Sequence, residues 1–363
     1  MTVYYIFIIL VFIFTYFSQV SDKTEVVEGI EKREYEHSVI STFWFFLIVA
    51  TMVFIGGLRF KVGTDYGAYY YFYEDFASSF LQKLKTYNEP GFSLICLLVT
   101  KFGGNGTAVI FISALMTYGI SMFSLYNKTH YVLMFTLLYV FLGCWHEGFN
   151  AVRQCLAGTF IVLGMNSLRE KRFFRYLFWV LIAGSFHRSA IVMIVLYFLV
   201  HRKISFKNIV LMIAACVVIL FSFDYLFDFS ETLLDANYSL EYGYITSSVN
   251  VLRILVAVAP AVFFLYLYKD IGFNEEDTFN MNFLLAHASI MIATSNSTFF
   301  ARMGIYTSPF VAVAFPELFK VVDLSKRRII TVVIIVLYFA YWYYDISINS
   351  TLNSFQFIWQ STQ

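Results

Sequence analysis

Long apolar runs, separated by short polar and charged stretches, repeat along almost the whole chain. A helix that crosses a membrane needs roughly 20 predominantly apolar residues. The pattern therefore predicts ten spanning helices, at residues 3–20, 39–58, 107–126, 131–149, 154–168, 209–227, 251–268, 281–295, 303–319 and 329–344.

Two further apolar stretches need the charge pattern for their assignment. Residues 91–102 are too few to span comfortably, and residues 176–200 contain the polar break Gly184-Ser185-Phe186-His187-Arg188-Ser189. Clusters of Lys and Arg mark cytoplasmic loops, and three such clusters lie at residues 169–175, 201–207 and 326–328.

If these three clusters share one side, residues 176–200 begin and end on that side. Two helices of about 12 residues each span only about 18 Å, so we expect a re-entrant or tilted hairpin. A single crossing would instead divide the basic loops between both sides. The hairpin tip places His187 and Arg188 deep in the membrane or near its opposite face, where ionisable groups are costly and usually functional.

Counting crossings from the basic loops gives each remaining loop a side. Residues 127–130 and 269–280 fall inside. The outside receives residues 103–106, 150–153, 228–241 and 296–302 and the C-terminal tail, and residues 59–90 join them if 91–102 do not span.

Three arginines, Arg59, Arg153 and Arg302, thus converge on the outer face. Lys61 and the lysines at 83 and 85 then lie outside as well, against the usual bias. A substrate anion could explain this exception.

Composition supports the membrane assignment. The chain is 60% hydrophobic and 13% charged, whereas soluble domains carry about 25% charged residues. Its mean hydropathy is +0.70. No linker-like shift divides it, so we expect one integral membrane domain over residues 1–363. The first run has no basic region before it or small-residue cleavage site after it, which favours a retained helix over a signal peptide.

Charge and cysteine usage exclude other classes. A net charge of +1 lacks the basic patch expected of a nucleic-acid partner. The four cysteines show no metal-ligand spacing and read as small core residues. Motifs for ATP hydrolysis, zinc proteolysis and a serine nucleophile are absent, as is a DxD motif. We therefore expect metal-free transfer with no cofactor, although the acids near Asp65 and Glu74 could hold a cation.

The densest polar segment is Gly56 to Tyr66, at the outer end of the second predicted helix. Backbone N–H groups in a tight turn and the Arg59 guanidinium could hold phosphate oxygens. The alternative is a loop with interfacial tyrosines. Glu89-Pro90 begins residues 91–102, where a carboxylate could cap the helix, bind or transfer a proton.

Two breaks carry further candidates. In residues 146–154, Arg153 could recognise an anion bidentately, with Gln154 beside it, or could pair with Glu147 for structure alone. His187 is a candidate general base because imidazole titrates near neutral pH, unless it only bonds a neighbouring carbonyl. Arg302 opens a late helix on the same predicted side.

Five segments in order carry a resemblance: GLRFKVGTDYGAYY, NEPGF, FNAVRQCLA, SFHRSA and FFARMGIY. Together they resemble the EpsG family of bacterial polysaccharide-production membrane proteins, and the match covers most of the chain. These proteins look like Wzy-type polymerases and O-antigen-ligase-type glycosyltransferases. The predicted fold class is thus all-α, a polytopic transmembrane bundle of about 10–12 membrane segments with re-entrant or broken helices.

The resemblance implies polymerisation of lipid-pyrophosphate-linked oligosaccharides into exopolysaccharide, capsule or O-antigen. It implies a bacterial cytoplasmic membrane protein whose active site faces outside. Donor and acceptor would be undecaprenyl-pyrophosphate-linked glycans in membrane lipid, with a flippase and a chain-length regulator as further partners. The pyrophosphate and substrate ligands would be Arg59, Arg153, Arg302, Tyr66, Gln154 and Arg188, and the base would be His187, Asp65 or Glu89. Tyrosines around the acidic loop 228–241 could contact sugars.

Other classes remain open on the sequence. A lipid-linked glycan flippase or another transporter would also need buried arginines and broken helices. A membrane acyltransferase using His187 lacks an acyl-donor motif. A scaffold for a polysaccharide assembly complex is the remaining alternative.

Overall fold

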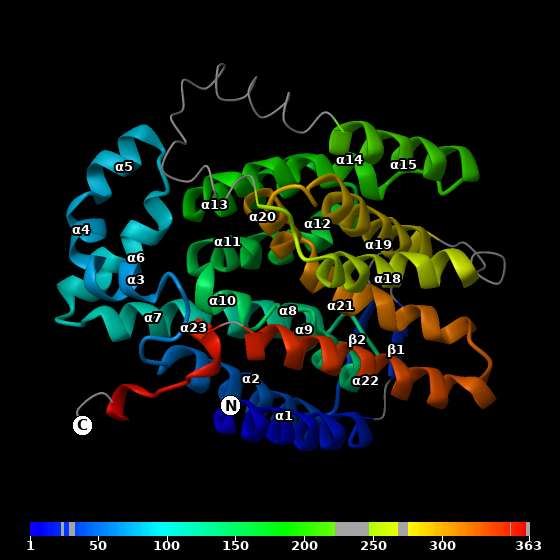
Figure 1. Ribbon diagram of the computed structural model, residues 1–363, viewed down its shortest axis with the longest axis horizontal. Helices are drawn as coiled ribbons and strands as arrows, with labels where there is room; N and C mark the ends of the chain where they lie inside the picture. The colour runs from blue at the N-terminus through cyan, green and yellow to red at the C-terminus, as the bar shows by residue number, and fades with distance from the viewer. Residues whose placement is uncertain (23–24, 29–32, 222–246, 268–274, 349, 361–363) are drawn as a thin grey trace. The chain divides into compact units, whose positions relative to one another are not determined.

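The computed structural model describes residues 1–22, 25–28, 33–221, 247–267, 275–348 and 350–360, and most of them are helical (Figure 1). The predicted all-helical, polytopic fold is confirmed. In the described part of the chain, four helical runs are long and apolar enough to cross a membrane. They are α1 (Thr2–Val20), α2 (Val39–Gly57), the run Gly106–Tyr126 and α22 (Leu324–Ile348).

One small sheet departs from the all-helical prediction. Strands β1 (Glu25–Glu28) and β2 (Arg33–Glu36) pair antiparallel between the first two helices, with Glu25 opposite Glu36. The acidic loop 228–241, with its neighbouring tyrosines, lies outside the described residues.

The chain divides into two compact units. The first unit comprises residues 1–194 and 324–363, and the second comprises residues 195–323. The expectation of one membrane domain stays a prediction. Besides the long helices and the sheet, the first unit contains α3 (Tyr66–Tyr71), α4 (Tyr73–Ser78), α5 (Phe80–Thr86), α6 (Pro90–Lys101), α7 (Gly106–Ala114), η1 (Leu115–Ile120), α8 (Ser121–Tyr126), α9 (Val132–Phe141), α10 (Glu147–Asn150), α11 (Val152–Leu163), α12 (Met165–Arg169), α13 (Phe173–Phe186), α23 (Ser350–Asn353) and η5 (Ile358–Gln360).

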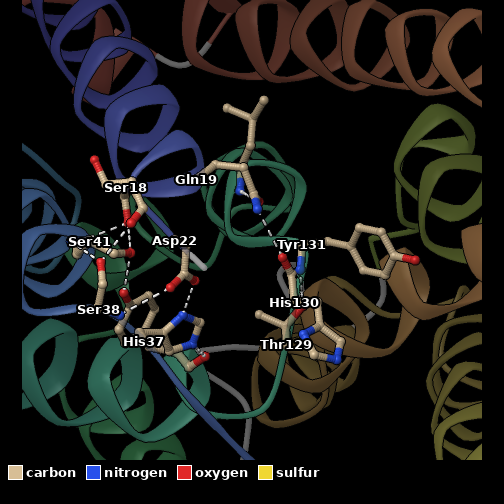
Figure 2. Close-up of polar contacts among 12 residues, drawn as sticks. Ser18, Gln19, Asp22, His37, Ser38, Ser41, Thr129, His130 and Tyr131 are labelled. Atoms are coloured by element: carbon tan, nitrogen blue, oxygen red, sulfur yellow. Dashed lines mark hydrogen bonds and ion pairs between the residues drawn. The ribbon is translucent and has the colours of Figure 1, made fainter. Parts of the chain in front are cut away.

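A buried polar network joins α1, α2 and α8 at one end of the first unit (Figure 2). The His37 ring lies between the Asp22 carboxylate, which Nδ1 contacts, and the Tyr126 carbonyl oxygen, 3.0 Å from Nε2. The side chain of His37 is 2% exposed and that of Asp22 is 0% exposed. The Ser38 side chain caps α2 by accepting a bond from the Ser41 amide. The start of α2 is therefore fixed to its neighbours.

The opposite end of α2 carries the polar loop and receives the C-terminal tail. A helix of 19 residues is about 28 Å long, so this loop lies well away from Asp22. The Phe60 amide donates to the Gln356 carbonyl at 2.8 Å, and the Ile358 amide donates to the Leu58 carbonyl at 3.1 Å. The loop after α2 and the tail thus meet at one end, as the crossing count predicts.

The short helix α6 stays at that same end. Arg153, at the start of α11, contacts both Glu89, which immediately precedes α6, and Tyr69 of α3. At the other end, the backbone of Gly106 packs directly on the Tyr70 carbonyl of α3, 2.1 Å from where a Cβ would lie. Because both ends of α6 lie by α3, residues 91–102 do not carry the chain to the far end.

The second unit is built around one helix, α19 (Glu275–Ala293). The Asn282 amide donates to the carbonyls of Val200 and Arg202, each at 2.8 Å, and the Phe283 and Phe310 rings stack. Its other elements are α14 (Leu196–Val200), α15 (Phe206–Phe221), α18 (Val251–Leu267), α20 (Thr298–Ala301), η3 (Arg302–Tyr306), α21 (Ser308–Glu317) and η4 (Leu318–Val321). The predicted helix 303–319 is thus three shorter pieces.

Candidate functional site

Glu89 immediately precedes α6 in an unusual backbone conformation. Its φ of 54° and ψ of 49° lie in the left-handed region, which residues other than glycine rarely adopt. Pro90 fixes the first helical turn after it. The Glu89 side chain makes no capping hydrogen bond to α6. Simple helix capping, one alternative from the sequence, is therefore not its role.

Both oxygens of the Glu89 carboxylate are occupied by donors from distant parts of the first unit. Oε2 accepts from the Arg153 guanidinium. Oε1 lies 2.9 Å from His187 Nδ1 and accepts the Arg188 backbone amide at 3.1 Å. The structure thus brings three predicted site residues together around the carboxylate of a fourth, Glu89.

The electrostatics of this cluster keep Glu89 ionised. Burial alone would raise the pKa of Glu89, but the His187 hydrogen bond, the Arg153 charge and the Arg188 amide together lower this pKa to about 2. A carboxylate with so low a pKa is a weak proton acceptor near neutral pH. Glu89 is better suited to hold and orient its partners than to act as a base.

Arg153 is positioned by α11 and by aromatic rings of α3 and α4. Its Nε lies 3.4 Å from the Tyr69 hydroxyl. Its guanidinium carbon lies 5.9 Å from the Tyr69 ring centroid and 5.7 Å from that of Phe76. The ion-pair partner of Arg153 is Glu89, 64 residues away in the chain, rather than the nearby Glu147.

His187 lies at the reversal between α13 and η2 (Arg188–Val195). Its extended backbone, with φ of −152° and ψ of 120°, ends α13. The Tyr176 hydroxyl donates to the Met193 carbonyl at 2.7 Å, so the two arms run side by side in opposite directions. The structure shows the predicted reversal of the chain at His187 within the first unit, whereas its re-entrant position in a membrane stays a prediction.

Gly91 allows α6 to approach α13 closely beside the cluster. A Cβ at Gly91 would lie 2.8 Å from Ser185 Oγ and 2.9 Å from the Phe186 ring. These contacts are shorter than real Cβ atoms tolerate. The missing side chain therefore sets the distance between the element that carries Glu89 and the one that carries His187.

Arg59 is placed differently from the other predicted ligands. It is 1% exposed, and burial lowers its pKa. Its guanidinium donates to the carbonyls of Gly56, Val62 and Gly148, and lies 4.8 Å from the Phe149 ring centroid. These contacts fix the loop after α2. Phosphate binding by Arg59 stays a prediction that these contacts do not support.

The remaining predicted residues are distributed around the two units. Asp65 precedes α3 and accepts from the Thr64 hydroxyl at 3.1 Å. Tyr66 is buried, and among the described residues its hydroxyl has no hydrogen-bond partner. Gln154 is buried on α11. The Arg188 side chain is exposed, and Arg302 begins η3 in the second unit.

Three neighbours of the cluster were not predicted as site residues. Tyr69 and Phe76 face Arg153, and the Lys83 ammonium lies 4.4 Å from the Phe76 ring centroid. The excess of lysine on the outer side was the available signal for Lys83. In the part of the chain that the structure describes, no three His, Cys, Asp or Glu residues gather to hold a metal ion.

Comparison with protein families gives one finding. A model described as the EpsG family matches residues 42–359 of the chain. The match includes every residue of the Glu89 cluster. Searches of curated proteins and of solved structures give no match.

Proposed function

The chain belongs to the EpsG family, a group of exopolysaccharide-associated, polymerase-like membrane proteins, and we propose that it joins lipid-pyrophosphate-linked oligosaccharides by glycosyl transfer. The observation that carries the proposal is the contact of one ionised carboxylate, Glu89, with both His187 and Arg153. A base and an anion-binding group are thereby held within one cluster, as this transfer requires.

His187 is the proposed base. When neutral His187 donates its Nδ1–H to Glu89, the lone pair of the imidazole is on Nε2. Glu89 also stabilises the imidazolium that forms when Nε2 takes a proton. The three alternatives for the base are thereby ordered: His187 acts on the substrate, Glu89 positions it, and Asp65 is the remaining alternative.

The proposed reaction exchanges one bond at the donor anomeric carbon. The acceptor hydroxyl oxygen attacks this carbon as its proton passes to His187 Nε2. The bond from the carbon to the pyrophosphate oxygen breaks, and its electron pair stays with the lipid pyrophosphate. The reaction conserves charge, because the proton gained by His187 matches the negative charge gained by the leaving group.

Arg153 is the proposed ligand of that leaving group. A guanidinium remains charged at all relevant pH values and matches phosphate geometry. Fixed cations at developing negative charge lower the barrier because they need little reorganisation during the reaction. Tyr66, Gln154 and Arg188 are proposed neighbours of the substrate, and Arg302 a further cation whose replacement by alanine should abolish elongation.

We place the reaction at the outer face of the bacterial cytoplasmic membrane. The crossing count supports this, since it puts residues 59–90 and 150–153 on that side. Donor and acceptor are proposed to be undecaprenyl-pyrophosphate-linked glycans. A flippase would supply them, and a chain-length regulator would limit the product.

Reconstitution tests this function directly. Purified protein in vesicles is supplied with a lipid-pyrophosphate oligosaccharide, and both glycan length and released lipid pyrophosphate are measured. Longer glycans with matching release are expected from the wild type, and none from Arg153→Ala. Arg172→Ala is the matched control, because Arg172 lies outside the cluster and pairs with Glu170. Glycan translocation without a new glycosidic bond would instead support a flippase.

A further inference from the structure

Lys83 is held beside the Glu89 cluster, although it belongs to a separate short helix, α5. Its ammonium lies 4.4 Å from the centroid of the Phe76 ring, and the Arg153 guanidinium carbon lies 5.7 Å from the same centroid. Phe76 packs edge-on against the fully buried Phe92, at 5.2 Å between centroids. Two cations, Lys83 and Arg153, therefore lie near the anchored Phe76 ring.

The neighbouring Lys85 gives a contrast on the same helix. Lys85 is exposed, whereas Lys83 is half-buried. Burial and the like charge of Arg153 lower the pKa of Lys83, and Glu89 only partly opposes this effect. A long, flexible side chain could extend into water instead. Its placement against Phe76 keeps its ammonium within electrostatic reach of Arg153.

Among the described residues, Glu89 is the carboxylate that forms an ion pair with Arg153, and Asp65 attracts Arg153 from a greater distance. Glu89 already accepts from Arg153, His187 and the Arg188 amide. Among the described residues, Lys83 contacts the Phe76 ring and forms no ion pair with a carboxylate. Two neighbouring cations, Lys83 and Arg153, with Glu89 bound to Arg153, attract an additional anion.

We propose that Lys83 and Arg153 together bind a diphosphate, with the Arg153 guanidinium on one phosphoryl group and the Lys83 ammonium on the other. The inference rests on the proposed function and adds Lys83 to its site. Arginine offers a planar fork of donors and lysine a compact charge. A single phosphate would engage one of these cations well, whereas a diphosphate offers oxygens to both.

The first test measures binding of inorganic pyrophosphate and of inorganic phosphate to the purified full-length protein by calorimetry. We expect pyrophosphate to bind at least tenfold more tightly than phosphate. Lys83→Met keeps an apolar stem over Phe76 and removes the charge, so it should erase this preference. Lys83→Arg should retain most of it, and Lys85→Met should bind like the wild type.

A second measurement needs no variant. Amine acetylation of the wild-type protein is followed at each lysine by peptide mass spectrometry, with and without inorganic pyrophosphate. Protection of Lys83 by at least fivefold, without protection of Lys85, is expected. Equal protection of both lysines, or of neither, would overturn the proposal, as would an undiminished pyrophosphate preference in folded Lys83→Met.

The outcomes separate this inference from the proposed function. Pyrophosphate binding that depends on Lys83, in a protein that elongates no glycan, would keep the diphosphate site and reject the polymerase. Elongation that is unchanged in Lys83→Met, together with unchanged pyrophosphate binding, would keep the polymerase and remove Lys83 from its site.

Discussion

Glu89 Oε1 and His187 Nδ1 lie 2.9 Å apart, although 98 positions separate the two residues in the chain. The contact joins the residue before α6 to the tip of the α13–η2 hairpin. Arg153 of α11 completes it from a third element. The cluster therefore exists only when these three elements pack together, and the ionisation of Glu89 depends on that packing.

The low pKa of Glu89 predicts how stability depends on pH. A carboxylate whose pKa is lowered by folding stabilises the folded state above its unfolded pKa, and this stabilisation is lost as pH falls toward its folded pKa. For Glu89 these limits are its ordinary pKa of 4.5 and its folded pKa of about 2. The contribution is on the order of 3 kcal/mol at neutral pH.

Thermal unfolding of the wild type and Glu89→Gln in detergent checks this prediction. The gap between their unfolding temperatures should be constant from pH 7 to about pH 5 and should shrink below about pH 4.5. A gap that is the same at pH 3 as at pH 7 would show that the Glu89 charge does not stabilise the fold.

The proposed roles of Glu89 and His187 predict different losses of activity. His187→Ala removes the base and should lower the elongation rate by about 10²–10⁴-fold. Glu89→Gln keeps the shape but loses the charge that stabilises the imidazolium, and its amide would face the Arg153 donors, so we expect roughly a 10²-fold loss. Glu74→Gln, an exposed acid on α4, is the control and should elongate normally. If His187→Ala retains full activity, the base is another group.

Gly91 offers a test that leaves every polar group in place. Gly91→Ala should push α6 away from Ser185 and Phe186 and so lengthen the contact between Glu89 and His187. A displacement of about 1 Å can cost about 10²-fold in rate. Gly67→Ala is the matched control, because its Cβ would make only ordinary contacts at 3.7 Å or more. Equal elongation rates for the two variants would contradict this explanation.

The sequence predicts the elements of the site better than their contacts. Apolar runs and basic clusters are local signals, and they predict the helices and the reversal at His187. A short apolar run with Glu89 before it likewise predicts α6. These features need no knowledge of what packs beside them.

The partners within the site depend on packing that no local pattern encodes. Arg153 has Glu147 six residues away in the sequence, yet it pairs with Glu89. Arg59 stands in the densest polar segment, but backbone carbonyls of α2, of its own loop and of α10 accept from its guanidinium. The excess of lysine on the predicted outer side is a weak signal for Lys83, but its proximity to Arg153 depends on the packing of Phe76 near both side chains.

The buried pair at the other end of the first unit should affect stability alone. Asp22→Asn removes the charged partner of His37 and disturbs the bond to the Ser38 amide. Removing the carboxylate leaves buried hydrogen-bond donors without their acceptor, which costs about 1–3 kcal/mol. Thermal unfolding should show this loss, whereas the elongation rate per folded molecule should be unchanged. Glu36→Gln, at an exposed position, is the control.

A comparable loss of elongation per folded molecule in Asp22→Asn would contradict this assignment. It would mean that the pair, which is about 28 Å from the outer end of α2, is coupled to the site.

Replacing Arg59 should lower stability, whereas replacing Arg153 should abolish pyrophosphate binding. Arg59→Met leaves the carbonyls of Gly56, Val62 and Gly148 without their donor, and each unsatisfied buried group costs about 1–3 kcal/mol. We expect less folded protein and a lower unfolding temperature, with normal pyrophosphate affinity in the folded fraction. Arg153→Ala should lose pyrophosphate binding. A folded Arg59→Met that no longer binds pyrophosphate would instead contradict a role for Arg59 in stability alone.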